Sequence, residues 1–251
     1  MTPFHGRKPS QLMEPIRNSD WNKVVAICQA THCTPRQVKH WSRVKLTGER
    51  ECVVMLPLHY AIIMTDGSKE SLNAVQALID VYPHSLECKE SNLQRTPLHL
   101  ACIQTNASEQ LIKLLLDKRS EAAMELDHLQ RLPLHYACAN KNLMAIQTVV
   151  GAYPEATAKR DGQGWLPLHV ACHYESDFEL IQFLLQINPD AVIAKTPLDK
   201  ETTMDLVKKQ GHFKDKHEIM DLLAEKEKYY VPTPHPFMDS FVTDNFLHPI
   251  Y

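Results

Sequence analysis

Three copies of a His-x-x-Cys pair are the residues of this sequence best suited to chemistry. They are His99 with Cys102, His135 with Cys138, and His169 with Cys172. Imidazole nitrogen and thiolate sulfur are ligands that zinc prefers in proteins, so the pairs suggest a metal-binding or redox protein. The alternative is that both residues serve the scaffold, with cysteine as a small, weakly polar core residue.

The pairs belong to a longer phrase that recurs four times. The copies are Leu56-Pro57-Leu58-His59-Tyr60-Ala61, Thr96-Pro97-Leu98-His99-Leu100-Ala101, Leu132-Pro133-Leu134-His135-Tyr136-Ala137 and Leu166-Pro167-Leu168-His169-Val170-Ala171. Their prolines step by 40, 36 and 34 residues, which converges on a repeat period of about 33 residues. A fifth, degenerate copy begins at Thr202 and Thr203.

The phrase resembles the Thr-Pro-Leu-His-x-Ala motif of the ankyrin-repeat family, over about residues 50 to 225. The resemblance implies an all-α solenoid of helix-turn-helix units with short β-hairpin fingers, elongated and curved. Gly211 and His212 fall where the family has its Gly-His turn, so we expect a C-terminal capping unit there. Two short helices at residues 12–17 and 21–28 are expected to cap the N-terminal end, for about six units in all.

The third copy indicates how one unit is built. Proline at the first helical position loses no hydrogen bond, so Pro133 is expected to start an inner helix. A polar turn at residues 140–142 leads to an outer helix with apolar residues at helical spacing, and Pro154 ends it. The polar stretch at residues 159–164 then predicts a finger, and its two glycines are consistent with positive φ.

The resemblance places the repeated histidines and cysteines in the scaffold. Equivalent positions of successive ankyrin units lie about 10 Å apart, whereas zinc binds its ligands at about 2.0 to 2.3 Å, so no metal site is predicted. Buried thiols are inert, and Cys33 or Cys52, outside the helices, are expected to react more readily.

The phrase also departs from the family motif. Only Thr96 keeps the hydroxyl that normally bonds the motif histidine. The other three units hold leucine at this position: Leu56, Leu132 and Leu166. These units must satisfy their histidine in another way.

Motifs for catalysis do not accompany the repeat. The sequence has no nucleophile elbow, phosphate-binding glycine loop, His-Glu-x-x-His helix or kinase signature. Its seven glycines leave little for loops around a cofactor. We therefore predict that the protein is not an enzyme, with no catalytic residue, no metal, no cofactor and no small-molecule substrate.

Composition and charge argue against other classes. The 251 residues are 44% hydrophobic and 23% charged, with a net charge of −3, so nucleic acid is not the expected partner. No apolar run reaches the roughly 18 to 20 residues that cross a bilayer, and no secretory signal is visible. We expect a monomer inside the cell, cytoplasmic or nuclear, with one or more proteins as partners.

One cationic cluster stands apart from this balance. It comprises Arg36, Lys39, His40, Arg43, Lys45 and Arg50, against only Glu49 and Glu51 nearby. Such a cluster is either an electrostatic docking patch or a solvated loop. Residues 31–50 lack the repeat phrase, and they form either a long loop or an extra short helix near residues 36–43.

We divide the chain into four parts. These are an N-terminal extension (1–9), capping helices and a linker (10–51), the repeat array (52–230) and a tail rich in proline and aromatic residues (231–251). Proline favours extended backbone in the tail. Its phenylalanines, Phe237, Phe241 and Phe246, suggest that it docks back on the solenoid or binds a second protein, and disorder is the third possibility.

In ankyrin proteins, partner binding is carried by finger tips and exposed positions of the inner helices. Counted from each motif proline, the resemblance implies partner-binding roles for Met64, Asn92, Arg95, Gln104, His128, Arg131, Asn140, Gln163, Trp165, His173 and Tyr174. Trp165 is the expected anchor, since a large ring on a glycine-flanked finger tip has no core to enter within its own unit. The alternative is that it packs on the preceding finger as a local staple.

These patterns predict a non-enzymatic protein-protein interaction module, acting as an adaptor, scaffold or regulator through its concave face and finger tips. A second hypothesis is a substrate-recruiting subunit of a larger enzyme complex, such as a ubiquitin ligase. The third is the metal-binding or redox protein suggested by the His-x-x-Cys copies.

Overall fold

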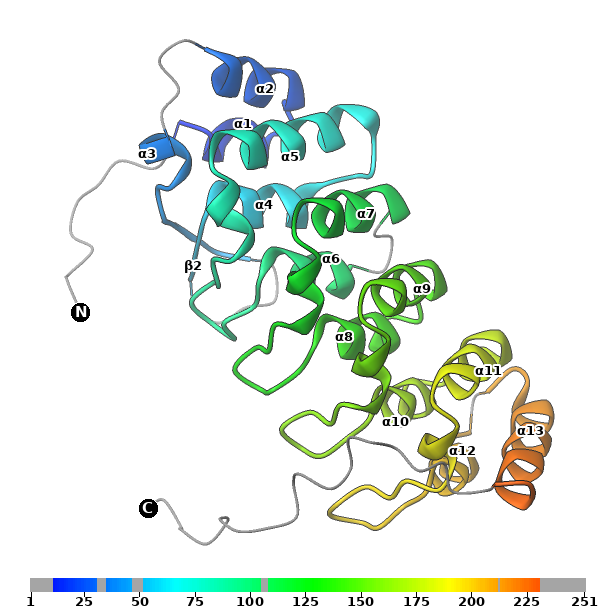
Figure 1. Cartoon of the computed structure of the whole chain (residues 1–251). Coiled ribbons are helices and arrows are strands. Elements are labelled where there is room, and N and C mark those ends of the chain that lie inside the picture. Colours follow the sequence, from blue (N-terminus) through cyan, green and yellow to red (C-terminus); the bar gives the residue numbers. More distant parts are fainter. Residues whose placement is uncertain (1–10, 31–34, 47–51, 105–107, 212, 231–251) are drawn as a thin grey trace, which may run out of the picture.

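Six helix pairs make up the fold in a computed structural model that describes residues 11–30, 35–46, 52–104, 108–211 and 213–230. The pairs are α1 (Met13–Arg17) with α2 (Trp21–Gln29), α4 (Pro57–Met64) with α5 (Lys69–Val81), α6 (Pro97–Ile103) with α7 (Glu109–Lys118), α8 (Pro133–Ala139) with α9 (Leu143–Ala152), α10 (Pro167–His173) with α11 (Phe178–Ile187), and α12 (Thr203–Lys209) with α13 (Lys216–Lys228). Figure 1 shows them side by side in sequence order along a curved row. The predicted all-α solenoid is confirmed.

The inner helices start where the sequence predicts. Each motif proline is the first residue of its helix, and the residue before it is extended. Proline suits this position because its fixed φ is helical and the first helical N–H needs no partner. The following leucine and alanine of each phrase are buried, so every inner helix contributes a face to the core.

Proline also ends the outer helices, as predicted. The sequence did not indicate that the same proline then begins a short 3-10 helix. Pro83, Pro154 and Pro189 each begin a short 3-10 helix: η1 (Pro83–Leu86), η3 (Pro154–Ala158) and η4 (Pro189–Val192). A fourth, η2 (Ser120–Met124), has no proline. These turns bring the chain from the outer helix back to the base of the next finger.

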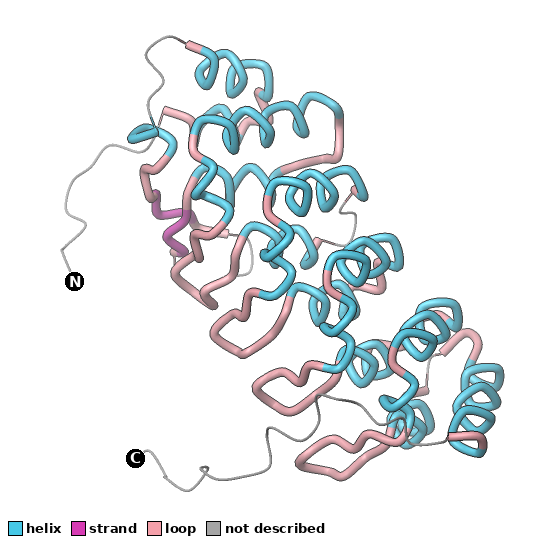
Figure 2. The backbone as a smooth tube through the Cα atoms, viewed as in Figure 1, coloured by secondary structure: helices cyan, strands magenta, loops and turns pink. Residues whose placement is uncertain are grey.

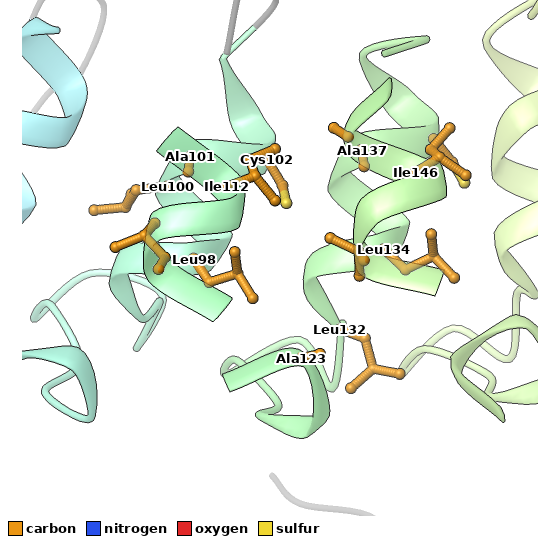
Figure 3. Packing of buried hydrophobic residues seen from close by; sticks show 14 of the residues in the cluster. Leu98, Leu100, Ala101, Cys102, Ile112, Ala123, Leu132, Leu134, Ala137 and Ile146 are labelled. Atoms are coloured by element: carbon orange, nitrogen blue, oxygen red, sulfur yellow. The ribbon is translucent and has the colours of Figure 1, made fainter. Parts of the chain in front are cut away.

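One continuous apolar core runs through the stack, from Leu12 in the first pair to Leu223 in the last. Figure 3 shows part of it, where Leu98 and Cys102 of α6 lie near α8 with its Leu134. Each unit therefore buries its apolar face against its neighbours, and stability is shared along the array. No helix among the described residues is long and apolar enough to span a membrane.

The linker before the first motif holds more structure than a loop. A short helix, α3 (Pro35–Val38), is followed by strand β1 (Ser42–Val44), which pairs antiparallel with β2 (Val53–Met55). The short helix was one of the two predicted alternatives, whereas the hairpin was not predicted. Three-residue strands are too short to show the alternation that identifies a strand in a sequence.

Four fingers follow the outer helices and project on one side of the stack (Figure 2). We define them as finger 1 (88–95), finger 2 (125–131), finger 3 (159–165) and finger 4 (194–201). Each is closed by one backbone hydrogen bond of 2.9 to 3.0 Å, such as that from Asp127 N–H to Arg131 C=O. The expected β-hairpins are present as loops, because the described residues of the fingers contain no strand.

The two finger glycines serve different purposes. Gly164 has φ +77°, as the sequence suggested, while Gly162 lets the chain approach finger 2. A Cβ at residue 162 would lie 2.7 Å from the carbonyl oxygen of Leu129. Non-glycine residues with positive φ take the turn position in the other fingers: Gln94, Gln130 and Lys200.

Several predictions fall on residues outside the described ranges. They concern the extension at residues 1–9, Cys33, Arg50, His212 and the tail at residues 231–251. The three alternatives for the tail and the four-part division of the chain stay predictions.

Candidate partner-binding site

The four motif histidines are used in the same way by every unit. Each Nδ1 accepts the backbone N–H of the residue before the motif proline, from Leu56, Thr96, Leu132 and Leu166 at 3.3, 3.2, 3.1 and 3.1 Å. Each Nε2 donates to a carbonyl in the finger that leads to the following unit, those of Cys88, Arg131, Trp165 and Ala194 at 2.9, 3.0, 3.2 and 3.0 Å.

These hydrogen bonds show how the three units with leucine before the motif proline satisfy their histidine without a threonine hydroxyl. The backbone N–H alone is enough, and the hydroxyl of Thr96 adds a 2.7 Å contact to His99 Nδ1 in its own unit. Because a carbonyl can only accept, Nε2 carries a proton. Because Nδ1 accepts a backbone N–H, it carries none, so the ring is neutral. Both nitrogens of each motif histidine are thus occupied by the scaffold.

The last helix pair departs from this pattern. Asp205 of α12 stands at the histidine position. Its carboxylate accepts the backbone N–H of Thr202 at 2.9 Å and the hydroxyl of the same residue at 2.8 Å. The final unit therefore satisfies its polar group locally.

Burial keeps the repeated histidines and cysteines in their neutral forms. Desolvation lowers the pKa of His59 and of His99 to about 4, and lowers the pKa of His135 and His169 as well. It raises the pKa of the Cys102 thiol to about 12. A neutral buried thiol is a poor nucleophile and a poor metal ligand. In the described ranges no group of three His, Cys, Asp or Glu side chains is placed to hold a metal ion.

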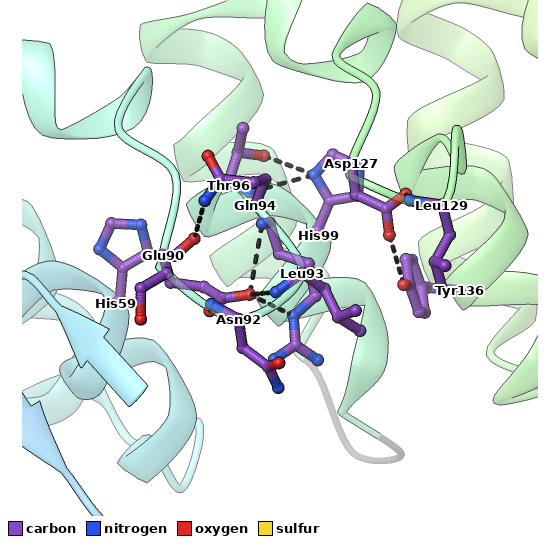
Figure 4. A network of polar contacts seen from close by, with 12 residues as sticks. His59, Glu90, Asn92, Leu93, Gln94, Thr96, His99, Asp127, Leu129 and Tyr136 are labelled. Carbon is purple, nitrogen blue, oxygen red and sulfur yellow. Dashed lines mark hydrogen bonds and ion pairs between the residues drawn. The ribbon is translucent and has the colours of Figure 1, made fainter. Parts of the chain in front are cut away.

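A buried carboxylate shapes each of the first three fingers. In finger 1, Glu90 is fully buried and accepts the N–H of Leu93 at 3.0 Å and Nε of Arg95 at 2.8 Å. Burial opposes its ionisation, but Arg95 and the backbone donors hold the pKa of Glu90 below its usual value. Figure 4 shows this network beside the buried Asp127 of finger 2.

In fingers 2 and 3 an aspartate accepts the backbone N–H groups, as Glu90 does in finger 1. Asp127 accepts the N–H groups of Leu129 and Arg131, both at 2.8 Å, and the hydroxyl of Tyr136. Asp161 accepts the N–H of Trp165 at 2.8 Å. Sequence reasoning missed these residues, although a signal exists: an acidic residue stands six or seven positions before each motif proline.

Two predicted interface residues instead join neighbouring inner helices. Gln104 donates from its amide to the carbonyl of Ile62, in the preceding inner helix. Asn140 donates to the carbonyls of Cys102 and Ile103 at 2.9 and 2.5 Å. Both side chains cap the end of the preceding helix, where carbonyls lack helical partners.

Replacement of Asn140 by alanine is expected to lower the free energy of unfolding by about 2 kcal/mol, because two part-buried carbonyls of α6 lose their donor. Urea unfolding followed by circular dichroism measures this. Gln163→Ala is the control, since Gln163 is exposed and should change stability by less than about 0.5 kcal/mol. An N140A protein as stable as the control would show that water replaces the amide.

Four further residues that were predicted to bind a partner lie at different places in the array. Arg95 is 9% exposed and ion-paired with Glu90, so its side chain is part of finger 1 and not of its surface. Met64 packs against the core while staying half-buried. Asn92 and His128 are exposed on fingers 1 and 2.

The remaining five predicted residues converge on one hollow of about 270 Å³ between fingers 2 and 3 and the inner helices α8 and α10. They are Arg131, Gln163, Trp165, His173 and Tyr174. The Trp165 ring meets the His173 ring edge to face, with centroids 5.2 Å apart, and His173 meets Tyr174 in the same way at 5.1 Å. Tyr174 is 50% exposed at the mouth.

The surroundings of Arg131 and Trp165 hold both side chains in place. Arg131 Nε lies 3.3 Å from Asp161, and its guanidinium lies 5.8 Å from the centre of the Tyr136 ring. Trp165 is half-buried, and its ring packs against His169 and His173 of its own unit. The expectation that it has no core to enter within that unit is wrong.

Comparison with known families identifies the repeat. A family model described as ankyrin repeats, in three copies, matches residues 58–159 and 109–195. Together these matches span residues 58–195, which is more than half of the 251 residues. No curated protein matches the chain.

Proposed function

The chain belongs to the ankyrin-repeat family, and from this premise we propose that it is a non-enzymatic module that binds a protein partner in the hollow beside fingers 2 and 3. Ankyrin repeats generally mediate protein-protein interaction. The observation that carries the proposal is the convergence of Arg131, Gln163, Trp165, His173 and Tyr174 on one hollow. Its volume suits one large apolar side chain of a partner.

The chemistry of the hollow favours recognition of a protein. Tryptophan, tyrosine and arginine dominate binding energy at protein interfaces, and the two aromatic residues bury a large area at a small loss of side-chain freedom. Here Trp165 and Arg131 are already held by His173 and Asp161, so little further ordering accompanies binding. A preorganised pocket of this kind is what a partner's anchor residue requires.

The scaffold residues of the repeat leave the side chains of the hollow available for a partner. The repeated histidines and cysteines are committed to internal bonds and core packing, so they do not compete for a partner. We propose that the protein acts as an adaptor, scaffold or regulator, as a monomer in the cell interior. Its nearly balanced charge and the core positions of its repeated cysteines support this setting.

Tyr174→Ala is expected to weaken partner binding at least tenfold while changing the free energy of unfolding by less than about 1 kcal/mol, because half of this side chain is exposed in the free protein. Affinity purification with mass spectrometry identifies the partner, and calorimetric titration of that partner gives the Kd. Tyr229→Ala is the matched control, since Tyr229 is an exposed tyrosine at the end of α13.

Trp165→Ala completes the comparison. This change should lower both affinity and stability, since the ring packs on α10. If Y174A and Y229A bind the partner equally well, the hollow is not the binding site and the proposal fails.

A further inference from the structure

The fingers and the hairpin are joined edge to edge by backbone hydrogen bonds. Ser91 N–H donates to Val54 C=O at 3.1 Å, which attaches finger 1 to β2. His128 N–H donates to Leu93 C=O at 2.7 Å, and Gly162 N–H to Leu129 C=O at 2.9 Å. We call this series, from β1 through β2 and fingers 1 to 3, the finger ladder. Like a sheet, it has two ends.

The C-terminal end of the finger ladder is closed. In finger 4 the position of His128 and Gly162 is taken by Pro197, which has no N–H to donate. Its ring packs instead against Gly164. Proline at an edge is a common way to prevent the addition of a further strand.

At the N-terminal end, β1 pairs with β2 alone among the residues that the structure describes, and the register shows which backbone groups its other edge presents. Arg43 lies opposite Val54 in the hairpin. Val54 uses its N–H and C=O on its other side, toward Ser91, at 2.8 and 3.1 Å. Directly opposed residues of an antiparallel pair point these groups either toward each other or both away. The N–H and C=O of Arg43 therefore point outward, away from β2.

The side chains along this edge are cationic. Ser42 and Val44 turn inward and are buried, while Lys39, Arg43 and Lys45 are exposed. Residues 35–46 contain no acidic residue. Among the described residues none of these three cations forms an ion pair. Of the described cations, Lys39 follows α3 with its Nζ 5.8 Å from the centre of the Tyr82 ring, Arg43 lies in β1, and Lys45 follows β1.

We propose that β1 is a second docking surface, which takes an acidic, extended segment of a protein partner as an added strand. The backbone groups of Arg43 would pair with the incoming strand, and the flanking cations would contact its carboxylates. A second copy of β1 fits poorly, because pairing two such edges brings like charges together. The chain's own tail begins after α13, at the opposite end of the array from β1 (Figure 1).

The test separates the charge of Arg43 from its backbone N–H. The probe is a fluorescein-labelled ten-residue peptide of alternating threonine and glutamate, and its control carries lysine for glutamate. Anisotropy titrations of the full chain at low salt should show at least tenfold preference for the glutamate peptide. R43A should weaken binding about threefold, and R43P, which also lacks the N–H, by about a further tenfold.

Folding is checked by thermal melting, and R43P should keep the hairpin because the Arg43 N–H makes no bond to β2. Y174A should bind the probe like the wild type, since the hollow proposed above is separate. Equal binding by R43A and R43P, or no preference for glutamate, would refute strand addition. A dimer in sedimentation velocity that R43P disperses would assign the edge to a second copy instead. Tighter probe binding by D239N/D244N would assign it to the tail.

Discussion

Lowering the pH from 7 to 5 is expected to remove about 4 kcal/mol from the free energy of unfolding through His59 and His99 alone. Burial lowers the pKa of both imidazoles to about 4, from 6.5 in the unfolded chain. The unfolded state therefore binds more protons than the folded state between these values. The stabilisation is complete above about pH 6.5 and is lost as the pH falls toward 4.

Urea unfolding at pH 7, 6 and 5 measures this effect. His99→Gln should be less stable than the wild type at pH 7 and yet lose about 2 kcal/mol less on acidification, because one titrating site is gone. His84→Gln, at a histidine with a 77% exposed side chain, should leave the pH profile unchanged. A wild-type protein equally stable at pH 7 and pH 5 would contradict the neutral, buried state of the motif histidines.

Gly164→Ala should lower the free energy of unfolding by about 3 kcal/mol, the second large effect that we expect. Gly164 has φ +77°, which strains a residue with a side chain, and a Cβ there would overlap the ring of Pro197. Gly151→Ala is the matched control. Gly151 lies within α9, and a Cβ there meets nothing within 4 Å.

The two alanine variants should therefore move in opposite directions. In the helix, G151A should raise stability by about 0.5 to 1 kcal/mol, since alanine is the better helix former. Urea midpoints of the two proteins decide the matter. Equal stability of G164A and the wild type would mean that finger 4 shifts away at little cost.

The inner and outer helices could be predicted from the sequence because their signals are local. Pro133 starts α8 and Pro154 follows the end of α9, and both effects act within one turn of the chain. The strands β1 and β2 could not be predicted in this way. Three residues are too few to show the alternation of a strand, and the two strands pair across the region around residues 47–51. The structure identifies them by their pairing with each other and by the hydrogen bond from Ser91 of finger 1 to Val54 of β2.

The candidate site was predictable in part for the same reason. Position within the phrase located Arg131, Trp165 and Tyr174 on one side of the array, and these do line the hollow. The position of Asn140 in its unit could not show that its amide donates hydrogen bonds to carbonyls 37 and 38 residues earlier in the chain. Nor did the position of Arg95 show that it is drawn inward by Glu90, although that pair is only five residues apart.

Asp205 bears on how the last helix pair of the array is completed. A histidine at this position donates to a carbonyl supplied by the following unit, so a unit that carries it is chemically incomplete without a successor. Asp205 is satisfied by Thr202 of its own unit and needs nothing downstream. One side chain thus distinguishes two kinds of unit: histidine ties its unit to the finger that follows, and aspartate leaves the last helix pair satisfied by its own residues.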